Sequence, residues 1–176
     1  MTLSCILLAL ILDAFFGEPN WLWSKLQHPA VTFGKIITWG EKKYNNGINR
    51  KGKGVIFLSV IVIFLATVGY IIEQLPFSAI WKILIVAILL SHKSLIEHVS
   101  AVSLGLQKDI DHGRKAVAMI VGRDTATLNE SNVARSAIES AAENFSDGII
   151  APLFWFFIGG LPGIIVYKFV NTAHSM

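Results

Sequence analysis

Three carboxylates, Glu139, Glu143 and Asp147, are spaced four residues apart near the end of a polar segment. On an α-helix this spacing places side chains on one face, while small apolar side chains and Ile138 occupy the other. Such an array suits Mg²⁺, which takes one or two protein oxygens and completes its shell with water and phosphate oxygens. The simpler interpretation is a solvated face on which Arg135 and Glu139 form an ion pair.

An arginine and an acid precede this array in the stretch VGRDT at 121–125. An arginine side chain can hold phosphate oxygens in a bidentate manner. Since the stretch AENFSDG closes the array at 142–148, acidic and guanidinium groups gather at both ends, which favours a phosphate-handling site. The candidate catalytic residues are Arg123, Asp124, Glu139, Glu143 and Asp147, and the candidate Mg²⁺ ligands are Glu143 and Asp147.

Helices have to position these groups, because no segment alternates in the manner of a strand. Between residues 92 and 148 apolar side chains recur at helical spacing. Asp109 or Asp111 can cap a second helix within this interval, and Asn129 or Asp124 can cap a third. The interval is therefore predicted to be a helical unit and not a disordered loop.

Long apolar segments flank this helical unit. The chain has 176 residues, 53% of them hydrophobic and 15% charged, and a mean hydropathy of +0.59, which is more apolar than an ordinary soluble domain. We expect an all-α, multi-pass integral membrane protein, a single membrane domain over residues 1–176 with a helical cytoplasmic segment at 92–148. The apolar segments are 1–16, 54–72, 77–91 and 149–170, and the glycines and prolines of the last predict a kinked or divided helix.

Basic residues are unevenly distributed, because thirteen of the 15 lysines and arginines lie within residues 17–53 and 92–148. The positive-inside rule places both intervals in the cytoplasm. A formal charge of +3 gives no indication of a nucleic-acid partner. The stretch GINRKGKG at 47–54 lacks the final Ser or Thr of a phosphate loop and is better interpreted as a basic flank that anchors a span to anionic lipid. The five histidines show no metal-binding spacing.

The run IVGRDTATLNESNVARSAIESAAENFSDGIIAPLFWFFIGGLPGIIVYKFVNTAHSM closely resembles the central signature of the CobD/CbiB family of cobalamin biosynthesis proteins, the adenosylcobinamide-phosphate synthases. The N-terminal DAFFGEPNWLWSKLQHPAVTFGKII resembles that family's opening pattern. The resemblance implies a multi-pass inner-membrane ligase that joins adenosylcobyric acid to aminopropanol or its phosphate, with ATP and Mg²⁺ as cofactors. It also implies a corrinoid and an aminoalcohol phosphate as substrates, and membrane lipid and other cobalamin biosynthesis enzymes as partners.

The resemblance adds candidate substrate-binding residues, namely Asp13, His28, Thr125, Asn144 and Asn171, with Glu18 and Pro29 in the N-terminal motif. One position departs from the family pattern, because His174 stands where the family reads Asp in N-T-x-D-S-M. Family members continue for a comparable length, so we expect the chain to be the N-terminal part of the enzyme. The alternative function is a non-catalytic membrane sensor or assembly protein of the related AmpE type, against which the GRDT and AEN stretches argue.

Overall fold

Helices form all the regular secondary structure of the computed structural model, within the residues that it describes (2–17, 19, 23–25 and 27–176). The all-α prediction is confirmed for this part of the chain, and Glu18 lies outside it. The helices are, in chain order, α1 (Thr2–Phe16), α3 (Pro29–Tyr44), α4 (Arg50–Gln74), α5 (Ser78–Leu89), α6 (His92–Lys108), α7 (Ile110–Ala118), α8 (Glu130–Phe145), the π-helix η1 (Ser146–Ile150) and α9 (Ala151–His174).

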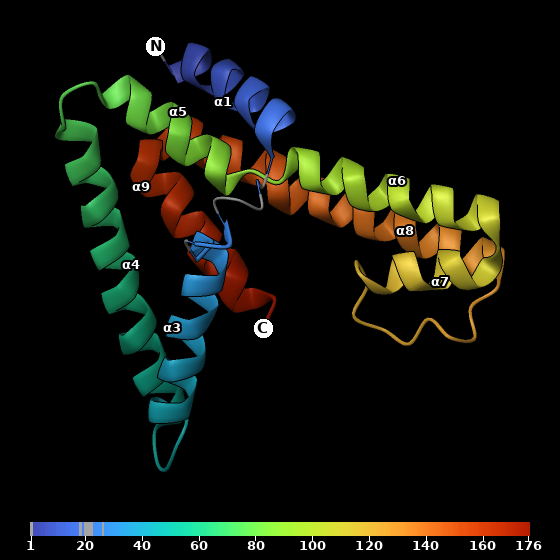
Figure 1. The fold of residues 1–176 in the computed structure, drawn as a ribbon. Coiled ribbons are helices and arrows are strands. Elements are labelled where there is room, and N and C mark those ends of the chain that lie inside the picture. Colours follow the sequence, from blue (N-terminus) through green and yellow to red (C-terminus); the bar gives the residue numbers. More distant parts are fainter. Residues whose placement is uncertain (1, 18, 20–22, 26) are drawn as a thin grey trace.

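The helices divide into two groups (Figure 1). Helices α1, α3, α4, α5 and α9 form an apolar cluster, and α6, α7 and α8 form an arm that extends away from it. In the cluster, Phe156 and Phe169 of α9 are fully buried. In the arm, Val102, Val117 and Val133 come from one helix each and pack together as a second, smaller core. The arm, which holds the candidate site, is thus a three-helix unit with a core of its own.

Large apolar side chains cover the outer surface of the apolar cluster. On α4, Ile56, Ile63 and Phe64 are each more than half exposed, and a surface of this kind matches hydrocarbon better than water. Three helical stretches are long and apolar enough to cross a membrane, namely Arg50–Gln74, Ser78–Lys108 and Glu130–His174, and α1 is a shorter apolar helix. These stretches overlap the predicted spans at 54–72, 77–91 and 149–170.

The basic residues before the first long span lie in a helix. Helix α4 begins at Arg50, so that Lys51 and Lys53 lie in its first turn. The interpretation of this stretch as a basic flank of the span stays a prediction.

The last apolar segment breaks at Gly160, whose φ of 60° and ψ of −149° belong to a region open mainly to glycine. Beyond the break the chain turns back, because a Cβ on Gly163 would collide with the carbonyl oxygen of Trp155. In a straight helix residues eight apart are separated by about 12 Å. The prediction of a kinked or divided helix at 149–170 is confirmed.

An ion pair from two other helices completes this break. The Leu161 N–H, at the start of the second half of α9, donates to Glu73 Oε1 at 3.1 Å. Lys82 Nζ lies 3.2 Å from the same oxygen. Because a new helix start leaves N–H groups without intrahelical acceptors, the Glu73 carboxylate supplies one from outside the helix.

Two helical connections join the arm to the cluster. Helix α5 passes into α6 at Leu90 and Ser91, and α8 passes into α9 through η1. The Ser91 N–H donates to the Gly148 carbonyl at 3.3 Å, and the Ser91 hydroxyl donates to the same oxygen at 3.4 Å. A Cβ on Gly148 would collide with that hydroxyl. The break in one connection is therefore bonded to the π-helix in the other.

Candidate functional site

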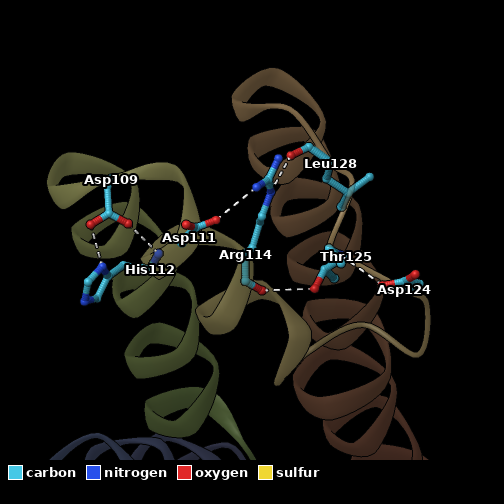
Figure 2. A network of polar contacts seen from close by, with 8 residues as sticks. Asp109, Asp111, His112, Arg114, Asp124, Thr125 and Leu128 are labelled. Carbon is cyan, nitrogen blue, oxygen red and sulfur yellow. Dashed lines mark hydrogen bonds and ion pairs between the residues drawn. The ribbon is translucent and has the colours of Figure 1, made fainter.

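A polar network fixes the connection between α7 and α8, residues 119–129 (Figure 2). Arg114 of α7 donates from Nε to the Leu128 carbonyl at 2.8 Å and from Nη1 to Asp111 Oδ1 at 2.9 Å. Its own carbonyl oxygen accepts from the Thr125 hydroxyl at 3.2 Å. Arg114 therefore ties the connection to α7 at two points.

The helices on both sides of this connection are capped as the sequence predicted. Asp109 Oδ1 accepts from the His112 N–H at 2.8 Å, and Asp109 Oδ2 lies 2.7 Å from His112 Nδ1. The backbone and imidazole donors of His112 hold the pKa of the Asp109 carboxyl below its usual range. Asn129 Oδ1 accepts from the Asn132 N–H at 2.9 Å and caps α8. Local capping chemistry thus sets both helix starts.

Two of the predicted site residues shape the connection itself. Thr125 is only 8% exposed, and its hydroxyl is engaged by Arg114. Asp124 Oδ1 accepts from the Ala126 N–H at 3.0 Å, which closes a small turn. In this arrangement both side chains position the segment from which Arg123 reaches α8.

Glu139 lies between two guanidinium groups. Arg123 Nη2 donates to Glu139 Oε2 at 2.8 Å, and Arg135 Nε donates to Glu139 Oε1 at 3.1 Å. The hydrogen bond from Arg123 and, to a lesser extent, that from Arg135 hold the pKa of this exposed carboxyl below its usual range. Glu139 lies in the arm, before the apolar segment at 149–170. The ion pair of the simpler interpretation is present, and Arg123 adds a second. Since a guanidinium carries five N–H donors, Arg123 is oriented by Glu139 and keeps donors for an anion.

Two adjoining cavities lie beside this ion-paired group. The first, here called the Glu143 cavity, has a volume of about 240 Å³, and its polar lining residues are Arg123, Ser136, Glu139, Ser140 and Glu143. The second, here called the His98 cavity, has a volume of about 430 Å³, and its polar lining residues are Ser91, Ser94, His98, Ser140 and Asn144. Ser140 and residues 120–122 line both cavities. The two cavities therefore adjoin at these residues.

Helix α8 provides most of the polar groups between the cavities. The Ser140 hydroxyl donates to the Ile120 carbonyl at 2.8 Å. Asn144 Nδ2 donates to the Ser140 carbonyl at 2.9 Å and to the Ser140 hydroxyl at 3.2 Å. The predicted residue Asn144 thus lines the His98 cavity and is oriented by its own helix. On α8, Ser136 and Ser140 are buried, whereas Ile138 is 70% exposed.

The two proposed Mg²⁺ ligands occupy different surroundings. Glu143 lines the Glu143 cavity beside Glu139 and Arg123. Asp147 follows one turn later in η1, and its carbonyl oxygen accepts from the Tyr167 hydroxyl at 3.1 Å. Within the described residues no group of three or more metal-binding side chains occurs. One or two carboxylates suffice for Mg²⁺ that is held largely by phosphate and water, so Glu143 fits such an ion, whereas Asp147 lines neither cavity.

The N-terminal candidates are built into the scaffold. Asp13 is 3% exposed, and its Oδ2 accepts from the His92 N–H at 2.9 Å and from the Lys93 N–H at 3.2 Å, at the start of α6. His28 Nδ1 accepts from the Ala30 N–H, and its Nε2 lies 3.2 Å from the Ile88 carbonyl. Neither residue lines the Glu143 or the His98 cavity. The structure thus gives Asp13 and His28 capping contacts between helices.

The C-terminal candidates lie at the end of α9. The Asn171 carbonyl accepts from the Ser175 N–H at 3.1 Å and from the Ser175 hydroxyl at 2.9 Å. His174 is the exposed final residue of the helix. Pro29 begins α3. None of these three residues lines the two cavities of the arm.

Sequence reasoning missed the polar groups that α6 contributes to the His98 cavity. Ser94 and His98 stand four residues apart and lie on one face of that helix. The spacing was visible in a segment already predicted to be helical. It was overlooked because the histidines were tested only for metal-binding patterns.

A sequence model of the family described as CobD/Cbib protein matches residues 6–176. The chain belongs to the CobD/CbiB family. Proteins named cobalamin biosynthesis protein CobD are similar to it, with 50% identity in Brucella anthropi over 96% of the chain and 55% of that protein, and 44% identity in Rhizobium meliloti over 97% and 55%. The corresponding protein of Rhodobacter capsulatus is 41% identical over 97% of the chain and 56% of its own length.

This membership confirms the resemblance seen in the GRDT, AEN and N-terminal motifs. The chain spans about half the length of the curated CobD relatives that it matches. No solved structure matches the chain.

Proposed function

We propose that the chain acts in cobalamin biosynthesis, as a ligase that forms an amide between the carboxyl group of adenosylcobyric acid and aminopropanol or aminopropanol phosphate. Support comes from membership of the CobD/CbiB family and from relatives named for cobalamin biosynthesis. The structural observation that carries the proposal is the Glu143 cavity, where Arg123 is oriented by Glu139 and stands beside a second carboxylate.

In the proposed ligation the charged side chains of this cavity and the residues next to them along the chain have defined tasks. Arg123 binds phosphate oxygens with the guanidinium N–H groups that Glu139 leaves unused. Glu143, with Asp147 as a second donor, holds Mg²⁺, which when bound neutralises phosphate charge. Asp124 and Thr125 keep the segment that carries Arg123 in place.

The reaction needs an activated carboxyl group and an uncharged amine. Phosphoryl transfer from ATP to the corrinoid carboxylate makes its carbon an electrophile, and the amine then displaces phosphate. A site with a guanidinium and carboxylates on one side and neutral donors such as Asn144 on the other can hold both reactants. Membrane lipid and other cobalamin biosynthesis enzymes remain proposed partners.

We also propose that the apolar helices cross the inner membrane and that the arm faces the cytosol. The support is the exposed apolar surface of α4 and the concentration of basic residues in 17–53 and 92–148. ATP and the corrinoid substrate are then available on the side of the arm.

Complementation of a strain that lacks the synthase tests the proposal. The wild-type chain should restore cobalamin-dependent growth, and Glu143→Ala should not. Glu130→Ala is the matched control, because Glu130 is an exposed carboxylate in the first turn of the same helix and lies outside both cavities. Equal growth with Glu143→Ala and Glu130→Ala would rule out the task given to Glu143.

A further inference from the structure

The hydrogen bonds of His98 define which of its ring nitrogens can accept a proton. His98 Nδ1 lies 2.7 Å from the Ser94 carbonyl oxygen, one turn earlier on α6, and 3.4 Å from the Ser94 hydroxyl, so its shorter contact is with the carbonyl. A carbonyl oxygen only accepts, so Nδ1 carries the hydrogen. In a neutral imidazole the other nitrogen, Nε2, is then a proton acceptor. The backbone of α6 thus fixes one tautomer of His98.

His98 is the single titratable side chain among the residues that line its cavity. The other polar lining groups are the hydroxyls of Ser91, Ser94 and Ser140 and the amide of Asn144. The charged groups nearest along the shared wall, Arg123, Glu139 and Glu143, belong to the adjoining cavity. The two cavities therefore divide the chemistry between a charged end and an end whose titratable group is one imidazole.

An aminoalkyl phosphate has the same division. Its phosphate carries the negative charge and its amine lies at the other end of a short chain. A guanidinium suits the phosphate, while hydroxyls, an amide and an imidazole suit the amine. Because Ser140 and residues 120–122 line both cavities, the places proposed for the phosphate and for the amine are neighbours.

Building on the proposed ligase function, we propose that the amine of the aminoalkyl phosphate lies in the His98 cavity and that His98 is the general base for its attack. The amine nitrogen forms a bond to the activated carboxyl carbon. The bond from that carbon to the phosphate oxygen breaks, and phosphate leaves with the electron pair. The proton lost by the nitrogen passes to His98 Nε2 and from there to solvent.

Nuclear magnetic resonance tests the binding step without any turnover. The probe is aminopropanol phosphate, added to the detergent-solubilised chain labelled with ¹⁵N in its histidine rings. The His98 Nε2 signal, assigned by its loss in His98→Gln, should shift, and the signals of His112, which pairs with Asp109 outside both cavities, should not. Inorganic phosphate alone should leave the His98 signal in place. An unmoved His98 signal with saturating aminopropanol phosphate overturns the inference, whether or not the chain is a ligase.

Turnover of the chain with ATP, Mg²⁺, adenosylcobyric acid and aminopropanol phosphate tests the base. His98→Ala should lower kcat by about a hundredfold or more, the range of general base catalysis, with a much smaller change in KM. Added imidazole should restore part of the rate to His98→Ala, and His112→Gln should match the wild type. Full activity of His98→Gln would refute the assigned base. A chain that binds the probe at His98 but forms no amide would count against the ligase proposal alone.

Discussion

Replacing Asp13 by alanine should destabilise the junction between α1 and α6. Asp13 is buried, and its Oδ2 accepts hydrogen bonds from the N–H groups of His92 and Lys93. The side chain of Ser91, the N-cap residue of α6, accepts no hydrogen bond from the first turn of that helix. Asp13 is therefore the acceptor that satisfies two orphan donors at this helix start.

The magnitude follows from the two N–H groups that lose their acceptor. Each partly buried donor left unsatisfied costs about 1–3 kcal/mol, and loss of a helix N-cap typically costs about 1 kcal/mol. Because these effects overlap, we expect Asp13→Ala to lower the free energy of local opening by about 2–4 kcal/mol. Since each 1.4 kcal/mol is tenfold, amide exchange at the start of α6 should accelerate about 30- to 700-fold.

Hydrogen exchange followed by mass spectrometry on the detergent-solubilised chain measures this effect. Peptides that cover residues 92–96 should exchange faster in Asp13→Ala, and peptides from the tip of the arm should not change. Asp13→Asn is the matched control, because it keeps an acceptor oxygen and should lose less than half as much stability. Unchanged exchange at 92–96 together with lost substrate binding would refute the capping argument and favour the substrate-binding role predicted from the sequence.

Two further predictions concern the break in α9 and the orientation of the chain in the membrane. Gly160→Ala should lower the thermal unfolding temperature, because its φ of 60° and ψ of −149° cost a non-glycine residue about 1–3 kcal/mol and the new Cβ would meet the Glu73 carboxylate. Gly159→Ala, which meets nothing within 4 Å, should unfold like the wild type, and equal losses would contradict this explanation. In a Cys5→Ser background, Gln74→Cys should react with a membrane-impermeant maleimide in intact cells, and Asn129→Cys should react only after lysis. Labelling of Asn129→Cys from outside would place the arm on the side away from ATP.

Short-range features of the sequence predicted most of the helical framework. Asp109 and Asn129 start α7 and α8 because their side chains bond to backbone groups only three residues away. The divided segment around Gly160 was likewise predictable, because glycine and proline act locally on the backbone. Such features depend on neighbours along the chain and need no knowledge of the tertiary fold.

Contacts between distant segments were beyond the reach of sequence reasoning. Asp13 bonds to residues about 80 positions later, and Glu73 bonds to Leu161, 88 positions later. Nothing in their sequence neighbourhoods distinguishes these carboxylates from ligand-binding ones. The pairing of Arg123 with Glu139 also requires the fold, because 16 residues and a whole connection separate them. For this reason the residue types of the candidate site were predictable, whereas its division into two cavities was not.

The interruptions of regular α-helix at Ser91 and at η1, which are hydrogen-bonded to each other, form a hinge between the arm and the cluster. Both connections between the arm and the cluster depart from regular α-helix at one level, where Ser91 donates to the Gly148 carbonyl. Helix α6 continues beyond this hinge for 17 residues, a length of about 25 Å at 1.5 Å per residue. A rotation of about 10° at this hinge would move the far end of the arm by about 4 Å. The residues of α6 and α8 that line the cavities would rotate with the arm. Small tilts of α5 and α9 in a bilayer would thus be magnified at the tip, in proportion to the length of the arm.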